Sequence, residues 1–180
     1  MRALVVYESM YGNTHLVADE IAAGLRGSFD VTVVPVEGAT ADAVADADLV
    51  VVGGPTHVHG MSSARTREAA LEAAKKDEHL EVDPDAEGPG LREWFDTIGR
   101  VDSTAAAAFD TRLDSSPLLT GRASRGIQRR LRKHGFRTIV DAESFLVDKQ
   151  TELLPGEPER ARAWGETIAS AMAERTATGS

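Results

Sequence analysis

Residues 9–14, Ser-Met-Tyr-Gly-Asn-Thr, combine residue types that bind a phosphate-like anion. They follow the apolar run 3–7 and lead into a helical pattern in which Val17, Ile21 and Leu25 are four residues apart. The first backbone N–H groups of a helix lack internal partners, and the helix dipole places partial positive charge there. Polar side chains in the segment add donors, and Gly12 lets the backbone approach a ligand closely. The segment therefore predicts an anion-binding turn at a helix N-terminus.

The composition of this turn excludes two common phosphate loops. No lysine follows a glycine, as the nucleoside-triphosphate loop requires, and the three glycines of the dinucleotide fingerprint are missing. Without lysine or arginine, amides and hydroxyls alone would hold the phosphate, which suits a monoester of modest charge. An ordinary helix start with Asn13 or Thr14 as the capping residue is the alternative interpretation of the turn.

The remaining apolar patterns predict alternating strands and helices. The expected strands are residues 2–7, 31–34, 49–52, 105–109 and 138–147, the last interrupted near Asp141. The expected helices are residues 14–26, 40–47, 64–76, 91–98 and 123–134, and a final helix that begins near Pro158. Such alternation predicts an α/β fold with a parallel sheet covered on both faces, in one domain over residues 1–175. We expect residues 77–90 to form a mobile surface insertion and residues 176–180 a disordered tail.

The strand followed by Ser-x-Tyr-Gly-Asn-Thr resembles the FMN phosphate loop of the flavodoxin-like proteins. The resemblance covers nearly the whole chain and implies a three-layer α/β/α fold with a five-stranded sheet in the order 2-1-3-4-5. It also implies a noncovalent FMN whose 5′-phosphate contacts residues 9–14. In sheets of this order, ligands bind beyond the carboxyl ends of the strands where the order reverses, a rule for which flavodoxin itself is a standard example.

Two further loops would then hold the flavin ring. The segment Gly-Pro-Thr-His-Val-His-Gly-Met at 54–61 resembles the ring-binding loop of the quinone-reductase branch of this superfamily, and residues 110–112 follow the fourth strand. The resemblance implies phosphate contacts from Ser9, Met10, Tyr11, Gly12, Asn13 and Thr14, and ring contacts from Pro55, Thr56, His57, Val58, His59, Gly60, Met61, Asp110, Thr111 and Arg112. Neither ring loop contains the tyrosine or tryptophan that carrier flavodoxins stack on the flavin, so one face of the ring is expected to be open.

Charged groups in these loops have more than one interpretation. His57 and His59 form a His-x-His pair without an obvious third ligand, so no metal site is predicted. They are either ordinary loop surface or a source of imidazolium that favours an anionic reduced flavin. Arg112 could favour the same anion, or it could pair with Asp110 or Asp114.

The overall charge excludes some classes of partner. The net charge of −9 argues against general nucleic-acid binding. The chain has no cysteine, no apolar run long enough to span a membrane and no segment resembling a signal peptide, so a cytoplasmic location is expected. Residues 115–140 contain seven of the 20 basic residues and no acidic residue. This basic segment is either a solvated helix face or a docking patch for an acidic partner or a phosphorylated substrate.

Together these patterns predict an FMN-binding, flavodoxin-like redox protein. It would be an electron carrier with a protein redox partner, or an enzyme that transfers electrons from NAD(P)H to a small quinone-like acceptor. No catalytic residue is predicted, because the cofactor would do the chemistry. The alternative is a non-redox domain of the same fold that binds a phosphate ligand or a partner and has lost FMN.

Overall fold

A computed structural model describes residues 1–57, 59–77 and 79–178 of the chain. The strands are β1 (Arg2–Tyr7), β2 (Asp30–Pro35), β3 (Leu49–His57), β4 (Gly60–Met61), β5 (Ala105–Leu113), β6 (Arg137–Thr138) and β7 (Glu143–Val147). The helices are α1 (Asn13–Leu25), α2 (Ala41–Ala45), α3 (Ala64–Ala74), α4 (Leu91–Thr97), α5 (Pro117–Thr120), α6 (Ala123–Lys133) and α7 (Glu157–Thr178), with a short 3-10 helix, η1, over Val36–Gly38.

The sheet has the strand order expected from the sequence. Its strands run in the order β2-β1-β3-β5-β6, and β7 pairs with β5 beyond the end of β6. The expected fifth strand is therefore divided into β6 and β7, with the predicted interruption near Asp141 lying between them. All of these pairs are parallel, whereas the short β4 pairs antiparallel with β3. The predicted parallel order 2-1-3-4-5 is confirmed.

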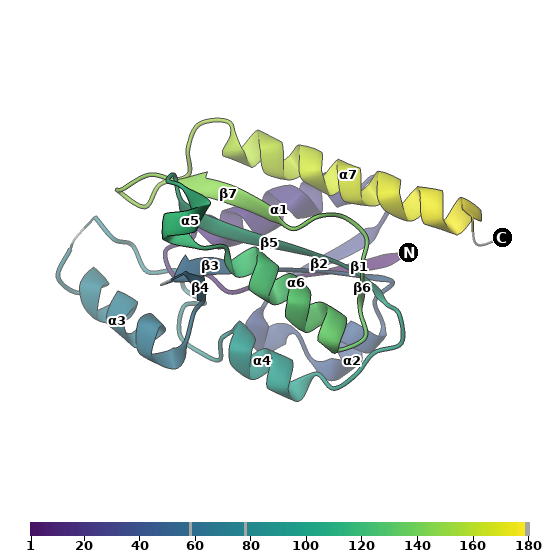
Figure 1. Ribbon diagram of the computed structural model, residues 1–180, viewed down its shortest axis with the longest axis horizontal. Helices are drawn as coiled ribbons and strands as arrows, with labels where there is room; N and C mark the ends of the chain where they lie inside the picture. The colour runs from purple at the N-terminus through teal and green to yellow at the C-terminus, as the bar shows by residue number, and fades with distance from the viewer. Residues whose placement is uncertain (58, 78, 179–180) are drawn as a thin grey trace.

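Helices cover both faces of the sheet and complete the three predicted layers. Figure 1 shows α1 and α7 on one face and α2, α4 and α6 on the other. Alternate residues of the strands supply the two cores, as the pleat requires. Val5 and Val51 pack beneath α1 and α7, whereas Val6 and Val52 pack toward α4 and α6. The carboxyl ends of the parallel strands lie together at one end of the sheet (Figure 1), where β3, β5 and β7 extend beyond β1.

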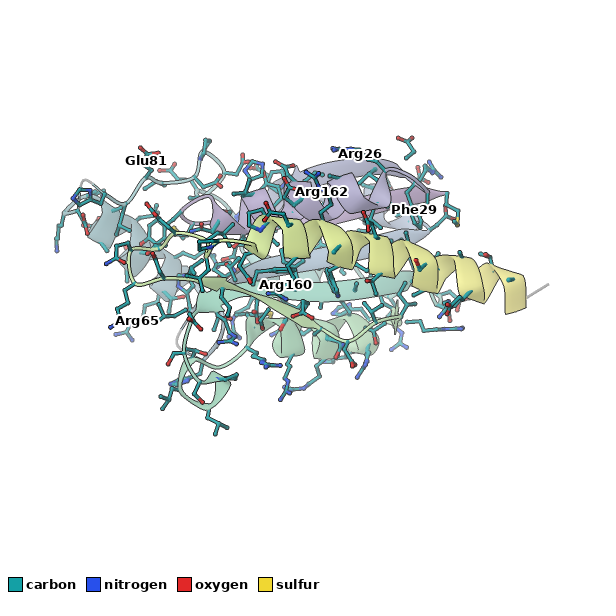
Figure 2. All side chains as sticks on the ribbon, turned by 90° about the horizontal axis from the view of Figure 1, so that it is seen from above. Arg26, Phe29, Arg65, Glu81, Arg160 and Arg162 are labelled. Carbon is teal, nitrogen blue, oxygen red and sulfur yellow. The ribbon has the colours of Figure 1, made fainter. Side chains whose placement is uncertain are left out.

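Helices α1 and α7 touch through their backbones. A β-carbon built on Gly24 would lie 2.1 Å from the carbonyl oxygen of Arg162, and one built on Gly165 would lie 2.3 Å from that of Ile21. Such distances leave room only for hydrogen at these two positions. Arg162 also forms an ion pair with Glu20 at 2.7 Å, and Figure 2 shows Arg162 where α7 runs beside α1.

Strands β3 and β5 each continue four or more residues beyond the predicted ends at 52 and 109. Gly53 permits this extension, because a β-carbon there would lie 2.1 Å from the ring of Phe109. Pro55 is tolerated because β1 ends at Tyr7, opposite Gly53, so Pro55 has a strand neighbour on only one side. The predicted loops at 54–63 and 110–122 are therefore partly strand, and the second also contains α5.

The second half of the predicted insertion at 77–90 packs against the turn that follows β1. The amide of Asp83 donates to the carbonyl of Met10 at 2.9 Å, and Asp83 and Ala86 are both buried. Whether the segment is mobile stays a prediction.

The C-terminal helix is longer than expected. Helix α7 continues to Thr178, beyond the predicted start of a tail at residue 176, and residues 179–180 lie outside the described part of the chain. Among the described residues, no helix combines the length and apolarity needed to cross a bilayer.

Two helical glycines give a matched test of the contact between α1 and α7. We expect Gly165→Ala to lower the free energy of unfolding by about 1–3 kcal/mol, because the added methyl group overlaps the backbone of α1. Gly126→Ala on α6 should raise it by up to about 1 kcal/mol, since its nearest new neighbour is Met61 at 3.8 Å and alanine favours the helix. Urea denaturation of the two variants measures both effects, and equal shifts would contradict the assigned contact.

Candidate functional site

A cavity of about 220 Å³ opens at the carboxyl ends of β1, β3, β5 and β7. The turn after β1, the last residues of β3 and β5, and the loop after β7 meet there, at the place where the strand order reverses. The lining residues are Met10, Tyr11, Asn13, Thr14, Pro55, Thr56, His57, Thr111, Arg112, Leu113, Val147, Asp148, Lys149 and Thr151. The three sequence-predicted loops therefore contribute to one cavity.

Helix α1 begins at this cavity without a side-chain cap. Gly12 is the N-cap residue, with φ of 84°, a backbone conformation that favours glycine. Its amide donates to Ser9 Oγ at 3.1 Å, but no side chain caps the helix. Asn13 and Thr14 already belong to the first turn, so the alternative in which either one caps the helix is wrong. The first-turn amides of α1 are thus available to an anion at the cavity.

Side chains of the turn join it to the neighbouring loops. Thr14 Oγ1 lies 2.8 Å from Thr111 Oγ1, a hydrogen bond between α1 and β5. Asn13 Nδ2 donates to the carbonyl of Thr151 at 2.6 Å, which ties α1 to the loop after β7. These bonds fix the relative positions of three loops that are far apart in the sequence.

Arg112 supplies a buried positive charge to the cavity wall. Its Nη1 donates to the carbonyls of Leu113, at 3.2 Å, and Ser115, at 2.8 Å. No ion pair to Asp110 or Asp114 forms among the described residues, so the proposed salt bridge is absent there. Its Nε is buried and has no hydrogen-bond partner. A buried donor without an acceptor is costly, and an anion in the cavity would satisfy it.

Two predicted ring residues hold the start of α6. The amide of Ala123 donates to Thr56 Oγ1 at 2.9 Å, and the amide of Ser124 donates to Asp110 Oδ2 at 2.6 Å. Asp110 is fully buried and does not line the cavity, whereas Thr56 does. Burial raises the pKa of the Asp110 carboxyl, and the hydrogen bonds from Ser124 oppose this shift. Asp110 thus positions α6 from beneath the site.

Two rings line the cavity. Tyr11 donates its hydroxyl to the carbonyl of Ala70 at 2.9 Å, which fixes the side chain beside α3. His57 is the last residue of β3, and burial lowers its pKa although the carboxylate of Glu8 opposes the shift. The neutral imidazole is therefore favoured, which argues against His57 as a source of imidazolium.

The other predicted ring residues face a different cavity. The strands β3 and β4 form a hairpin in which Thr56 pairs with Met61 and His57 with Gly60. His59, Gly60 and Met61 line a separate cavity of about 840 Å³ together with residues of α5 and α6. His59 has a positive φ of 71°, and Val58 lies outside the described residues.

Sequence reasoning missed the loop after β7. Val147, Asp148, Lys149 and Thr151 line the cavity, and Lys149 adds a second basic side chain. Their position after a strand was the available signal, because all carboxyl ends of a parallel sheet share one edge.

The N-terminal part of the chain is similar to a known protein family. Residues 4–74 match a family described as flavodoxin domain. These residues contain the uncapped start of α1 and the whole of the β3–β4 hairpin. No curated protein matches the chain.

Solved structures share the fold over almost the whole chain. Oxidised flavodoxin 1 from Bacillus cereus has 17% sequence identity and a TM-score of 0.66, with 94% of this chain and 98% of that chain covered. A WrbA-like flavodoxin from Agrobacterium tumefaciens has 19% identity and a TM-score of 0.60, with coverage of 96% and 98%. A rubredoxin oxygen:oxidoreductase from Desulfovibrio gigas has 18% identity and a TM-score of 0.65, with 98% of this chain but 37% of that chain covered.

The buried carboxyl of Asp110 predicts a pH effect on stability. Because its pKa is raised in the folded state, its contribution to stability is fully present below the unfolded pKa of about 3.9 and is lost as the pH rises through the folded pKa. Asp110→Asn should therefore become more stable relative to the native chain as the pH rises from about 4 to 7. Urea unfolding across this range measures the effect, with exposed Asp114→Asn as the control. A pH-independent difference would contradict it.

Proposed function

We propose that this chain, which has a flavodoxin-like fold, binds FMN noncovalently and transfers electrons through it. One observation carries the proposal: the uncapped start of α1 and the unpartnered Nε of Arg112 line the same cavity at the reversal of strand order. The first-turn amides of α1 would hold an anionic monoester, and the guanidinium of Arg112 would attract negative charge on a ring bound beside it. The match to the flavodoxin domain over residues 4–74 includes the turn that would contact the phosphate.

The donors fit the two parts of FMN differently. Residues 9–14 would hold the 5′-phosphate through amides and the hydroxyl of Thr14, as the sequence predicted. Pro55, Thr56, His57, Thr111 and Arg112 would border the ring, because they line the cavity beyond the turn. Asp110 would act only through α6, and His59, Gly60 and Met61 would approach the ring from the other side of the hairpin. These contacts are proposals.

Bound FMN would supply the one- and two-electron redox chemistry. The chain's own residues would set the charge around it. Arg112 keeps its charge at all physiological pH values and is buried, so it would favour an anionic form of the ring. His57 is held in its neutral form by burial, so it would serve as a hydrogen-bonding group rather than a cation. We therefore assign the stabilisation of an anionic reduced flavin to the guanidinium of Arg112 and not to the imidazole of His57.

The absorbance spectrum of the purified protein, incubated with FMN and gel-filtered, tests the proposal. Retained bands near ~375 and ~450 nm are expected for a bound oxidised flavin. A protein that never retains FMN would favour the alternative, a flavin-free domain that binds another phosphate ligand or a partner.

Thr14→Val should weaken FMN binding about tenfold or more. The substitution keeps the branched shape but removes a hydroxyl at the proposed phosphate contact, and a hydrogen bond to a charged group contributes about 1.5–3 kcal/mol. A fluorescence titration with FMN measures the affinity. Thr167→Val is the matched control, because the Thr167 hydroxyl donates to the Ala163 carbonyl on the exposed face of α7. Equal affinity of the two variants would refute the phosphate-contact assignment.

A second candidate function is NAD(P)H-dependent reduction of a quinone-like acceptor. The cavity of about 840 Å³ lies on the other side of the hairpin from the proposed FMN phosphate, and α6 lines it with Arg125, Arg129 and Arg130. Arg130 lies 4.0 Å from Asp96, while Arg125 and Arg129 have no ion pair within the described ranges. Two neighbouring arginines without acidic partners in those ranges, beside a ring-binding loop, are suited to bind the phosphates of a dinucleotide.

Steady-state oxidation of NADH and NADPH with a quinone distinguishes this enzyme from a carrier. If the arginines bind the nucleotide, the double variant Arg125→Gln/Arg129→Gln should raise KM for NAD(P)H about tenfold, the loss of roughly one charge-assisted hydrogen bond. Arg26→Gln, an exposed change at the end of α1, is the matched control. The absence of turnover by the native FMN-loaded protein would refute the enzyme and favour the carrier.

A further inference from the structure

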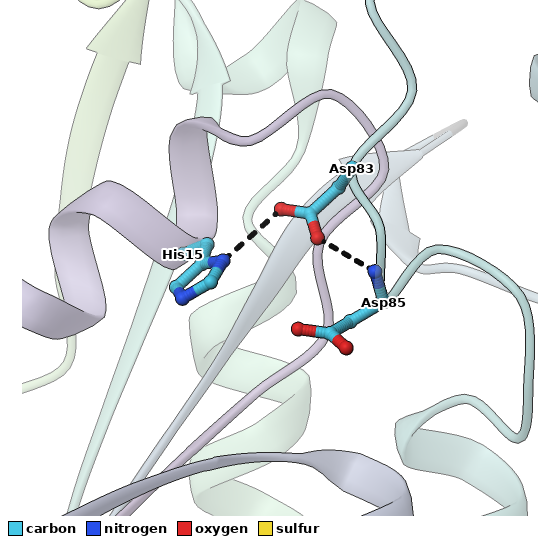
Figure 3. Close-up of side chains that lie close together, drawn as sticks. All are labelled: His15, Asp83 and Asp85. Atoms are coloured by element: carbon cyan, nitrogen blue, oxygen red, sulfur yellow. Dashed lines mark hydrogen bonds and ion pairs between the residues drawn. The ribbon is translucent and has the colours of Figure 1, made fainter.

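The segment 77–90 brings two carboxylates to a histidine of α1. Figure 3 shows Asp83 and Asp85 facing His15, one turn from the uncapped end of the helix. His15 Nδ1 lies 3.4 Å from Asp83 Oδ2. One ligand atom from each of the three side chains lies within 4.8 Å of the others.

The imidazole of His15 is held in place from two sides. It stacks on the ring of Tyr7, with a centroid separation of 4.2 Å and an interplanar angle of 17°. Its Nε2 lies 3.9 Å from Asp19 Oδ2, on the next turn of α1. Nδ1 is thus directed at Asp83 while Nε2 faces a second carboxylate. An imidazole that binds a metal through one nitrogen usually presents the other to such a carboxylate.

Asp83 has a buried oxygen without a hydrogen-bond donor. Its side chain is 1% exposed, and Oδ1 accepts a hydrogen bond from the amide of Asp85 at 2.9 Å. Oδ2 is buried, points at His15 and has no hydrogen-bond partner. A buried carboxylate oxygen without a hydrogen-bond donor is costly, and a cation beside it would offset that cost.

Asp85 completes the cluster with an exposed carboxylate. Its Oδ2 accepts a hydrogen bond from the Tyr7 hydroxyl at 2.6 Å, so a proton donor fixes the carboxylate. Asp19, Asp83 and Asp85 form no ion pair with lysine or arginine in the part of the chain that the structure describes. Three carboxylates therefore surround one imidazole, which leaves a local excess of negative charge.

We propose that His15, Asp83 and Asp85 bind a divalent transition-metal ion of the Zn²⁺ class. Ligands about 2.0–2.2 Å from a tetrahedral Zn²⁺ are separated by roughly 3.4 Å, the distance observed between His15 and Asp83. One imidazole nitrogen and two carboxylate oxygens suit such an ion better than an all-oxygen site for Mg²⁺ or Ca²⁺ would. Asp19 is the positioning residue that orients the imidazole.

The ion would join the segment 77–90 to the start of α1. Asp83 already contacts this region through its amide, which donates to Met10, and through its Oδ2, which would lie 4.0 Å from a β-carbon at Gly12. A cation there would neutralise carboxylates beside the anion-binding turn. This second effect rests on the proposed function, whereas metal binding itself does not.

Calorimetric titration of the FMN-free full chain with ZnCl₂ tests the site. We expect one ion per chain, and at least about tenfold weaker binding for His15→Gln, for Asp83→Asn and for Asp85→Asn. Asp19→Asn should weaken binding by about 10-fold and shift the absorption bands of a Co²⁺-loaded protein. His79→Gln is the matched control, since exposed His79 lies in the same segment outside the cluster.

Loss of affinity in His79→Gln equal to that in His15→Gln would overturn the proposal, as would the absence of a one-to-one isotherm for the native chain. Asp85 is exposed, so its variant is expected to fold even if Asp83→Asn does not. Repeating the FMN titration with and without Zn²⁺ separates the two proposals. A native one-to-one isotherm in a chain that never binds FMN would support the metal site alone.

Discussion

The site depends on the pairing of β3 with β5 beyond the end of β1. Seven residues of β3 are in register with β5, and the last of these pairs are Gly54 with Asp110 and Pro55 with Thr111. The extension requires Gly53, because the ring of Phe109 occupies the space of any side chain there. Without it, Thr56 would not cap α6 and Arg112 would not line the cavity. The packing of Gly53 against Phe109 in the core thus determines which polar groups meet at the carboxyl edge of the sheet.

Hydrogen bonds then join the segments at the carboxyl edge of the sheet to one another. Thr14 contacts Thr111, Asn13 contacts the loop after β7, and Asp83 contacts the turn after β1. Opposite charges gather on either side of this edge. Acidic groups cluster near His15, whereas arginines line the cavity beside α6. The basic segment noted in the sequence is a solvated face of α6 that also borders a cavity. Its role as a docking patch for an acidic partner or a phosphorylated substrate stays a prediction.

Local patterns in the sequence predicted the alternating strands and helices, and the family resemblance supplied the strand order. The apolar runs and the position of Gly12 located the strands and the start of α1, because burial and backbone conformation act over a few residues. The site was predicted less completely. Asp110 accepts a hydrogen bond from the start of α6, and the β3–β4 hairpin lines a different cavity on each side. Both features depend on how β5 and α6 pack, which no short sequence pattern encodes. The approach of Asp83 to His15 joins positions 68 residues apart and had no signal in sequence spacing.

The backbone contact between α1 and α7 would have a consequence for the proposed electron transfer. Helix α1 is held against α7 at two glycines, so it has little freedom to slide or rotate when a ligand arrives. Its N-terminal dipoles are therefore oriented before any charge appears near them, and they need not reorient when that charge changes. Beside a bound flavin, a rigid array of dipoles of this kind would lower the reorganisation energy that accompanies each change of redox state. The small residues of the helix interface would thereby help electrons to move quickly at the opposite end of α1.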